Sequence, residues 1–213
     1  MAALSMLEHD ELLRRLRGDL EDSYDEELEM EFGDRDRVSE EVPEPPTDDE
    51  KKKVADVLTQ LRSYAQPKGV ALGIEPVNRY ETYLCNTGQD ACEYFRMMGV
   101  DDFIIHFDTY HMNIEEDQFS TALKQAGKFA GYIHMSESHR GLPGEGTVDW
   151  DNVFQGLKEI QYQGPLVLEA FAAINPDLIG ATCLWRKSRY EPLQLAVKGL
   201  EFLKKKATQH GLS

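Results

Sequence analysis

The stretch FIIHFDTYHMNIEE, residues 103–116, runs from apolar residues into an acid, Asp108, and a histidine, His111, follows three residues later. The apolar part is typical of a buried β-strand. Burying an unpaired carboxylate costs free energy, so an acid that closes such a strand requires a compensating partner. The stretch therefore predicts a buried strand whose C-terminal end belongs to a functional site.

Short apolar runs and amphipathic segments alternate on both sides of this stretch. Continuous apolar strands that alternate with amphipathic helices indicate βα units and a parallel sheet buried on both faces, so we predict an α/β fold. Asn86 or Thr87 is expected to cap one helix and Gly99 to end it, while Glu115 and Glu116 are expected near the positive end of the next. The expected strands are 70–76, 103–108, 131–135 and 165–171, and the expected helices are 54–64, 86–99, 115–129, 150–161 and 191–206.

The negative charge of the chain is concentrated at its N-terminus. Residues 1–50 contain 19 Asp or Glu against 5 Lys or Arg, whereas the other 163 residues contain 20 acids and 18 bases. Residues 8–31 have leucines near helical spacing, and the proline-rich acidic stretch that follows reads as a linker. We therefore predict an acidic extension over residues 1–50, disordered or partly helical, and a folded domain over residues 51–213.

Composition also excludes several classes of protein. The acidic balance argues against a nucleic-acid partner, which would need clustered Lys and Arg. No apolar run approaches the roughly 18 residues of a membrane span, and the N-terminus lacks the pattern of a signal or transit peptide. The three cysteines match neither a disulfide scaffold nor a zinc finger. These features indicate a cytoplasmic protein that binds no membrane.

Four of the expected strands end on a residue that can bind a metal: Glu75, Asp108, His134 and Glu169. They are 33, 26 and 35 residues apart, about one strand and one helix each time. The C-terminal ends of parallel strands lie on one face of a sheet, so these side chains can converge. Taken singly, such an acid is more often a helix cap or surface group, and His106, inside its strand, is more often a satisfied core or interface residue than a ligand. Together, three carboxylates and an imidazole predict a divalent cation, with Mn²⁺, Mg²⁺ and Co²⁺ as the candidates.

Residues 51–206 resemble the C-terminal half of the ketose 3-epimerases, the D-tagatose and D-psicose 3-epimerase family of xylose-isomerase-like barrels. The resemblance rests on EPVNRYET (75–82), DTYHMNIEE (108–116), HMSESHRGLPGEGTVDW (134–150), LEAF (168–171) and LWR (184–186). It implies that the four strand-end residues bind the metal, Mn²⁺ being the expected ion, and that Glu75 and Glu169 are also the acid/base pair. It further implies that Glu81, His111 and Arg140 hold the sugar near its carbonyl.

These residue types suit epimerisation at C3 of a ketose. The reaction removes a proton α to the C2 carbonyl, gives an enediolate and returns a proton to the opposite face, which two carboxylates serve better than one. A metal polarises the carbonyl oxygen and stabilises the developing charge. Trp150 is expected to pack in the core, and Trp185 and Arg186 either line the pocket or make a structural contact.

The resemblance begins at the helix before the fifth strand of such a barrel, and a complete barrel needs about 250 residues. The expected architecture is therefore a partial (β/α)8 TIM barrel of about four βα units, strands 5–8. Its open edges predict association with a second copy or with a missing N-terminal half. Two alternatives stay open: another isomerase of the same superfamily, acting for example on hydroxypyruvate or an inosose, and a non-catalytic half-barrel whose acidic extension recruits a basic partner.

Overall fold

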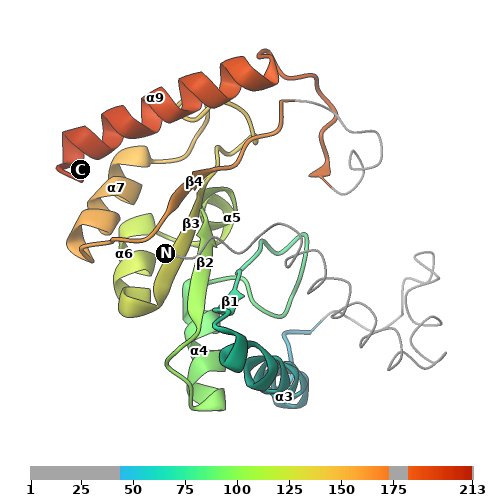
Figure 1. Cartoon of the computed structure of the whole chain (residues 1–213). Coiled ribbons are helices and arrows are strands. Elements are labelled where there is room, and N and C mark those ends of the chain that lie inside the picture. Colours follow the sequence, from blue (N-terminus) through green and yellow to red (C-terminus); the bar gives the residue numbers. More distant parts are fainter. Residues whose placement is uncertain (1–43, 173–181, 213) are drawn as a thin grey trace. The chain divides into compact units, whose positions relative to one another are not determined.

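The computed structural model describes residues 44–172 and 182–212, so the predicted helix over residues 8–31 and most of the acidic extension lie outside the described residues. Within the described residues, helices and strands alternate along the chain (Figure 1). The elements are α3 Asp48–Ala65, η1 Gln66–Lys68, β1 Gly73–Ile74, α4 Gly88–Met98, β2 Ile104–Asp108, α5 Thr109–Glu115, α6 Phe119–Ala126, η2 Gly127–Phe129, β3 Ala130–Met135, α7 Trp150–Glu159, β4 Leu166–Leu168 and α9 Pro192–His210.

The four strands form one sheet in the order β1-β2-β3-β4, and every neighbouring pair is parallel. This confirms the predicted α/β fold with a parallel sheet. β1 is much shorter than the predicted strand over residues 70–76, because only Gly73 and Ile74 pair with β2. Pro76 follows soon after and has no N–H to donate to a further ladder hydrogen bond. Among the described residues β1 and β4 form the two edges of the sheet.

The two faces of the sheet differ in chemistry. Successive side chains of a strand point to opposite faces. In β2 and β3 one set of alternate residues is apolar and at most 1% exposed, and it packs with the helices in the hydrophobic core: Ile105, Phe107, Ile133 and Met135. The other set is polar or aromatic: His106, Asp108, Tyr132 and His134. The polar face therefore carries the residues that the sequence singled out.

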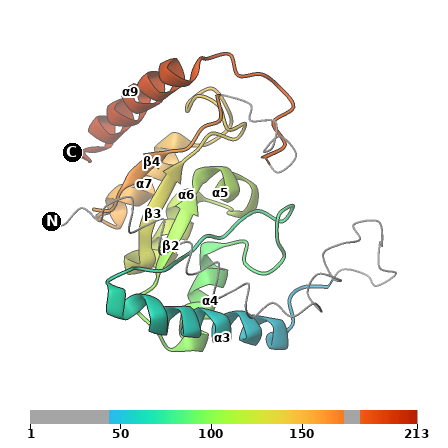
Figure 2. The ribbon, with the colours of Figure 1, turned by 45° about the vertical axis from the view of Figure 1, so that its right-hand side comes forward.

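The helices follow one another in chain order, with α3 against α4, α4 against α6, α6 against α7 and α7 against α9. Figures 1 and 2 show α3 and α9 at the two ends of this row. Thr87 caps α4 through a capping box, which decides between the two expected cap residues, and Gly99 ends the helix in the left-handed conformation with φ 66°. No helix within residues 44–172 and 182–212 is long and apolar enough to cross a membrane.

The prediction that a helix begins at residue 115 is wrong. The chain enters α5 directly after β2, and a second helix, α6, begins at Phe119. Glu115 therefore lies in the last turn of α5, where it pairs with Arg79, and not at the positive end of a helix. Glu116 accepts a hydrogen bond from the backbone N–H of Gly88, the first residue of α4, at 2.8 Å. The two acids thus tie the C-terminal end of α5 to Arg79, between β1 and α4, and to the first residue of α4.

Candidate active site

The four predicted ligands lie close together at the C-terminal ends of the strands. Asp108 and His134 are register partners in β2 and β3, while Glu75 and Glu169 directly follow β1 and β4. His134 Nδ1 is 3.9 Å from Asp108 Oδ2 and 3.6 Å from Glu169 Oε1. Potential ligand atoms of Asp108, His134 and Glu169 all lie within 4.8 Å of one another, as do those of Glu75, Asp108 and His111.

The two carboxylate oxygens of Asp108 have different partners. Oδ1 accepts a hydrogen bond from the N–H of Tyr110 at 2.8 Å and so caps α5. Oδ2 accepts one from Nη1 of Arg140 at 2.6 Å. The side chain is almost completely buried, and this burial, together with the neighbouring Glu169, raises the pKa of Asp108. Asp108 therefore both starts a helix and presents one oxygen to the site.

Arg140 is the positive charge of the cluster. Its Nη1 donates to Asp108 and Glu169, and its Nη2 lies 3.3 Å from Nε2 of His111. The guanidinium carbon also lies 3.9 Å from the centre of the Tyr110 ring, a cation–π contact. Arg140 has φ 59°, a left-handed conformation that is uncommon outside glycine, and its loop holds it there. The guanidinium thus bridges two of the predicted metal ligands.

His111 and Glu81, predicted to hold the sugar, meet at one side of this cluster. Nδ1 of His111 accepts a hydrogen bond from the backbone N–H of Asn78 at 3.1 Å, and Nδ2 of Asn78 donates to Glu81 at 2.8 Å. His111 is buried, and burial together with the charge of Arg140 lowers its pKa. Asn78 was missed in the sequence, although it follows Glu75 by three residues in the same motif.

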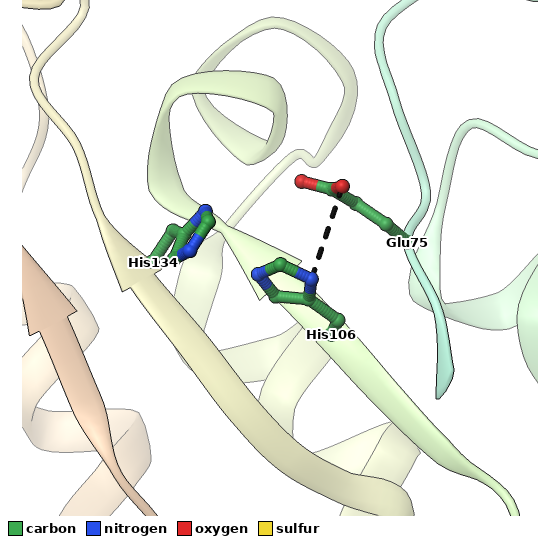
Figure 3. A group of neighbouring side chains, drawn as sticks. All are labelled: Glu75, His106 and His134. Carbon is green, nitrogen blue, oxygen red and sulfur yellow. Dashed lines mark ion pairs between the residues drawn. The ribbon is translucent and has the colours of Figure 1, made fainter. Parts of the chain in front are cut away.

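Glu75 faces His106 on the neighbouring strand, as Figure 3 shows. Glu75 Oε2 lies 3.8 Å from His106 Nδ1. Burial and the charge of Glu169 raise the pKa of Glu75 to about 7. His106 was expected to be a satisfied core or interface residue, but its Nε2 is buried and has no hydrogen-bond partner among the described residues. Side chains alternate between the two faces of a strand, and His106 lies two residues before Asp108. The sequence could therefore have placed its ring on the polar face of β2.

The residues present fit a divalent cation. They offer carboxylate oxygens and imidazole nitrogens, the donors that Mn²⁺, Mg²⁺ and Co²⁺ accept in proteins. Nδ1 of His134 is buried without a hydrogen-bond partner among the described residues, as a nitrogen reserved for a metal would be. The clustered carboxylates also need positive charge, which Arg140 supplies to Asp108 and Glu169.

Glu137 organises the loop that carries Arg140, and sequence reasoning missed it. Its side chain is fully buried, and its carboxylate accepts four hydrogen bonds. The donors are the backbone N–H groups of Ser138, Gly144 and Val148 and the indole N–H of Trp150, at 2.8 to 3.1 Å. Trp150 packs in the core, as predicted. The backbone carbonyl of Glu137 also accepts from the N–H of Arg140 at 2.8 Å.

A cavity of about 340 Å³ adjoins Arg140. Tyr110 and Phe171 line it together with Trp185 and Arg186, the two residues for which the sequence left a pocket wall and a structural contact open. Both residues line this cavity, whereas none of the four predicted metal ligands does. Such a volume admits a small polar molecule next to the guanidinium.

Comparison with known proteins gives a consistent family. The model of the xylose isomerase-like TIM barrel family matches residues 32–206. The L-ribulose 3-epimerase of Methylomonas sp. (strain DH-1) is 40% identical to this chain over 151 residues, 70% of this chain and 53% of that protein. The ketose 3-epimerase of Arthrobacter globiformis is 38% identical over 146 residues, 68% of this chain and 50% of that protein. The chain thus spans about half the length of these curated relatives.

Solved structures similar to this chain come from the same family of epimerases. A crystal structure of D-allulose 3-epimerase from Methylomonas sp. superposes with a TM-score of 0.72 and 37% identity, covering 78% of this chain and 59% of that one. A structure of L-ribulose 3-epimerase gives a TM-score of 0.75 and 33% identity, covering 79% and 58%. The predicted partial barrel and the predicted family are confirmed: the chain belongs to the xylose isomerase-like TIM barrel family.

Proposed function

We propose that this chain carries the metal and acid/base site of a ketose 3-epimerase that acts on free ketoses of the D-tagatose, D-psicose or D-fructose type. The observation that carries the proposal is the meeting of Glu75, Asp108, His134 and Glu169 at the ends of four neighbouring strands. The names of the relatives support the substrate class, since ketose, L-ribulose and D-psicose 3-epimerases are among them.

The four strand-end residues are the proposed ligands of one divalent cation, with Mn²⁺ as the first candidate and Mg²⁺ or Co²⁺ as alternatives. When bound, the cation would polarise the C2 carbonyl and stabilise negative charge that develops on the sugar. Arg140 bridges two of these ligands through Asp108 Oδ2 and Glu169 Oε2, while Glu169 Oε1 faces His134 Nδ1 at 3.6 Å. The guanidinium has five N–H donors, so it can also donate hydrogen bonds to sugar oxygens.

Glu75 and Glu169 are the proposed acid/base pair. One carboxylate takes the proton from C3 and the other returns a proton to the opposite face of the enediolate, with the roles exchanged in the reverse reaction. A general base works best when its pKa is near the working pH, and burial together with Glu169 raises the pKa of Glu75 to about 7. Burial acts in the same direction on Glu169, but Asp108, Arg140 and the nearby histidines outweigh it and lower the pKa of Glu169. The two environments thus shift the pKa values of Glu75 and Glu169 in opposite directions, as an acid/base pair requires.

Glu81, His111 and Arg140 are the proposed sugar-binding residues. Nδ1 of His111 accepts the N–H of Asn78, and its Nε2 lies 3.3 Å from Nη2 of Arg140, which places the ring beside the guanidinium. Glu81, held by Asn78, offers carboxylate oxygens to sugar hydroxyl groups. Of these three residues, Arg140 also lines the cavity of about 340 Å³.

The proposal extends to partners and setting. β1 and β4 each have a strand neighbour on one side only among the described residues, and an unpaired strand edge favours association. A second copy or a separate N-terminal half is the proposed partner at these edges. Cys85 and Cys92 are free thiols, which supports a reducing, cytoplasmic setting.

One relative favours a second candidate reaction. The 3-dehydro-D-guloside 4-epimerase of Escherichia coli (strain K12) is 38% identical over 122 residues, 57% of this chain and 47% of that protein. Epimerisation next to a C3 ketone uses the same proton removal α to a carbonyl, so the same carboxylate pair could serve it. A substrate panel separates the two reactions, and it also tests hydroxypyruvate as the substrate of another isomerase of the superfamily.

Proton exchange is the sharpest test. The purified chain is incubated in D₂O with Mn²⁺ and D-fructose, D-tagatose or L-ribulose, alone and with the N-terminal half of the Methylomonas relative as a separate chain. NMR should show deuterium at C3 and the appearance of the C3 epimer. Glu75→Gln and Glu169→Gln should slow both by about 10²- to 10⁴-fold, and Glu201→Gln, an exposed acid of α9, should not.

The absence of exchange under every condition, together with a well-behaved monomer that binds no Mn²⁺, would contradict the enzyme and favour the non-catalytic interaction protein. Sizing by light scattering supplies the oligomeric state for this decision.

A further inference from the structure

His106 lies on the same face of β2 as Asp108, two residues earlier. In the register between β1 and β2, Ile74 pairs with Ile105. The residues that follow these two along the chain, Glu75 and His106, therefore lie side by side. On the other side His106 is the register partner of Tyr132, and its ring centre lies 4.2 Å from that of His134. His106 is therefore a neighbour of two proposed metal ligands on two different strands.

The two nitrogens of the His106 ring face different neighbours. Figure 3 shows Nδ1 turned toward Glu75 and the other nitrogen turned toward His134. Nδ1 lies 3.8 Å from Glu75 Oε2. A neutral imidazole carries its proton on one nitrogen and a lone pair on the other, and the nearby carboxylate favours the proton on Nδ1. The lone pair is then on Nε2.

Nε2 of His106 is buried and has no hydrogen-bond partner among the described residues. Leaving a buried polar atom without a partner destabilises the fold. If the ring only filled space at this position, an apolar ring would be more stable there, because it has no unpaired nitrogen. Ligand atoms of Glu75, His106 and His134 all lie within 4.8 Å of one another, a spacing that one cation can span.

We infer that His106 is an additional imidazole ligand of the divalent cation, which gives the site two nitrogen donors and a preference for Co²⁺ or Ni²⁺ over Mg²⁺. The inference rests on the proposed function, which supplies the cation. Imidazole donors favour the later first-row ions, whereas Mg²⁺ prefers oxygen ligands and retained waters. Loss of the His106 nitrogen should therefore weaken Co²⁺ binding more than Mg²⁺ binding.

The competing explanation is a packing role. The His106 ring meets the ring of Tyr132 edge to face at 4.8 Å between centres, a contact that phenylalanine could preserve. His106→Phe therefore removes the nitrogen and keeps an aromatic ring, and His106→Gln removes the ring and keeps a polar group. His210→Ala is the matched control, because His210 pairs with Asp151 on α7, outside the metal cluster.

The experiment uses the full chain, freed of metal and then titrated calorimetrically with CoCl₂ and with MgCl₂. Both His106 variants should bind Co²⁺ at least about 10-fold more weakly and change far less toward Mg²⁺, while His210→Ala should match the parent protein. Proton NMR of the Co²⁺-loaded parent should show strongly shifted N–H signals from two imidazoles, one of which disappears in His106→Phe.

Four outcomes would overturn the inference. A single shifted imidazole in the parent protein, or two that both persist in His106→Phe, overturns the inference and leaves the proposed function standing. Equal Co²⁺ affinity of the parent and both variants does the same. Failure of the parent protein to bind either ion overturns the inference and the proposed function together.

Discussion

Glu137→Gln should destabilise the fold far more than a change of one atom suggests. The carboxylate of Glu137 is fully buried, and each of its oxygens accepts two hydrogen bonds. Glutamine keeps one oxygen but turns an NH₂ group toward two N–H donors, so two hydrogen bonds are lost and the donors are left unsatisfied. At about 1.5 kcal/mol for each lost charge-assisted bond, the free energy of unfolding should fall by about 3 kcal/mol.

Urea unfolding followed by circular dichroism measures this loss, since Trp185 would add to the fluorescence of Trp150. For a domain of this size, the melting temperature should fall by about 6–12 °C. Glu201→Gln, on an exposed face of α9, is the control and should stay within about 0.5 kcal/mol of the parent. If Glu137→Gln also stays within that limit, the carboxylate does not hold the loop as we argue.

The pH dependence supplies a second check. Burial acts to raise the pKa of Glu137, but the hydrogen bonds from Ser138, Trp150, Val148 and Gly144 outweigh it and hold the pKa below the ordinary value. A carboxylate with a lowered pKa stabilises the fold fully above its unfolded pKa of about 4.3, and this contribution is lost as the pH falls through the folded pKa. Glutamine does not titrate, so the difference between parent and variant should shrink below about pH 4.

Three further changes test other parts of the structure. Arg140→Met should lower the free energy of unfolding by about 3 kcal/mol in the absence of cations, because it leaves a buried carboxylate unpaired. Mn²⁺ should raise the urea midpoint of this variant more than that of the parent. Equal midpoints of the two proteins without cation would refute the pairing. Gly131→Ala should cost about 1–3 kcal/mol, since a Cβ there would lie 2.5 Å from the side chain of Ile104, and an unchanged midpoint would contradict that close approach. Burial raises the pKa of Cys85 to about 12, so iodoacetamide should label it only after urea unfolds the chain, and rapid labelling of the native protein, read by peptide mass spectrometry, would contradict its burial.

The parallel sheet and the convergence of strand ends could be predicted because both depend on local patterns. Apolar runs that end on Asp108 or His134 mark the strand ends, and parallel strands present those ends on one face. The start of α5 was missed because its cap is Asp108 itself, which the sequence had already assigned to the strand. One residue can serve both elements because its backbone pairs in the sheet while its carboxylate oxygen Oδ1 caps the helix.

Glu137 could not be predicted for a different reason. A glutamate in a loop rich in glycine and polar residues reads as exposed, since buried carboxylates are rare unless they are paired. Its partners are backbone N–H groups up to 11 residues away and one indole, and backbone donors leave no trace in the sequence. His106 was within reach of sequence reasoning, because alternation along β2 already places it on the face of Asp108.

The register between β2 and β3 explains how the site is assembled from these strands. Ile105 pairs with Ala130, but His106 pairs with Tyr132, so Gly131 is an extra residue in β3 and the register shifts by one. Had the first register continued, Asp108 would lie level with Ile133, a residue of the apolar core face. The shift instead brings it level with His134, whose side chain shares its face. A close approach to β2 favours glycine at the extra position, and such irregularities often re-aim side chains next to active sites. The proposed metal site thus depends on the extra residue Gly131, which is not one of its ligands.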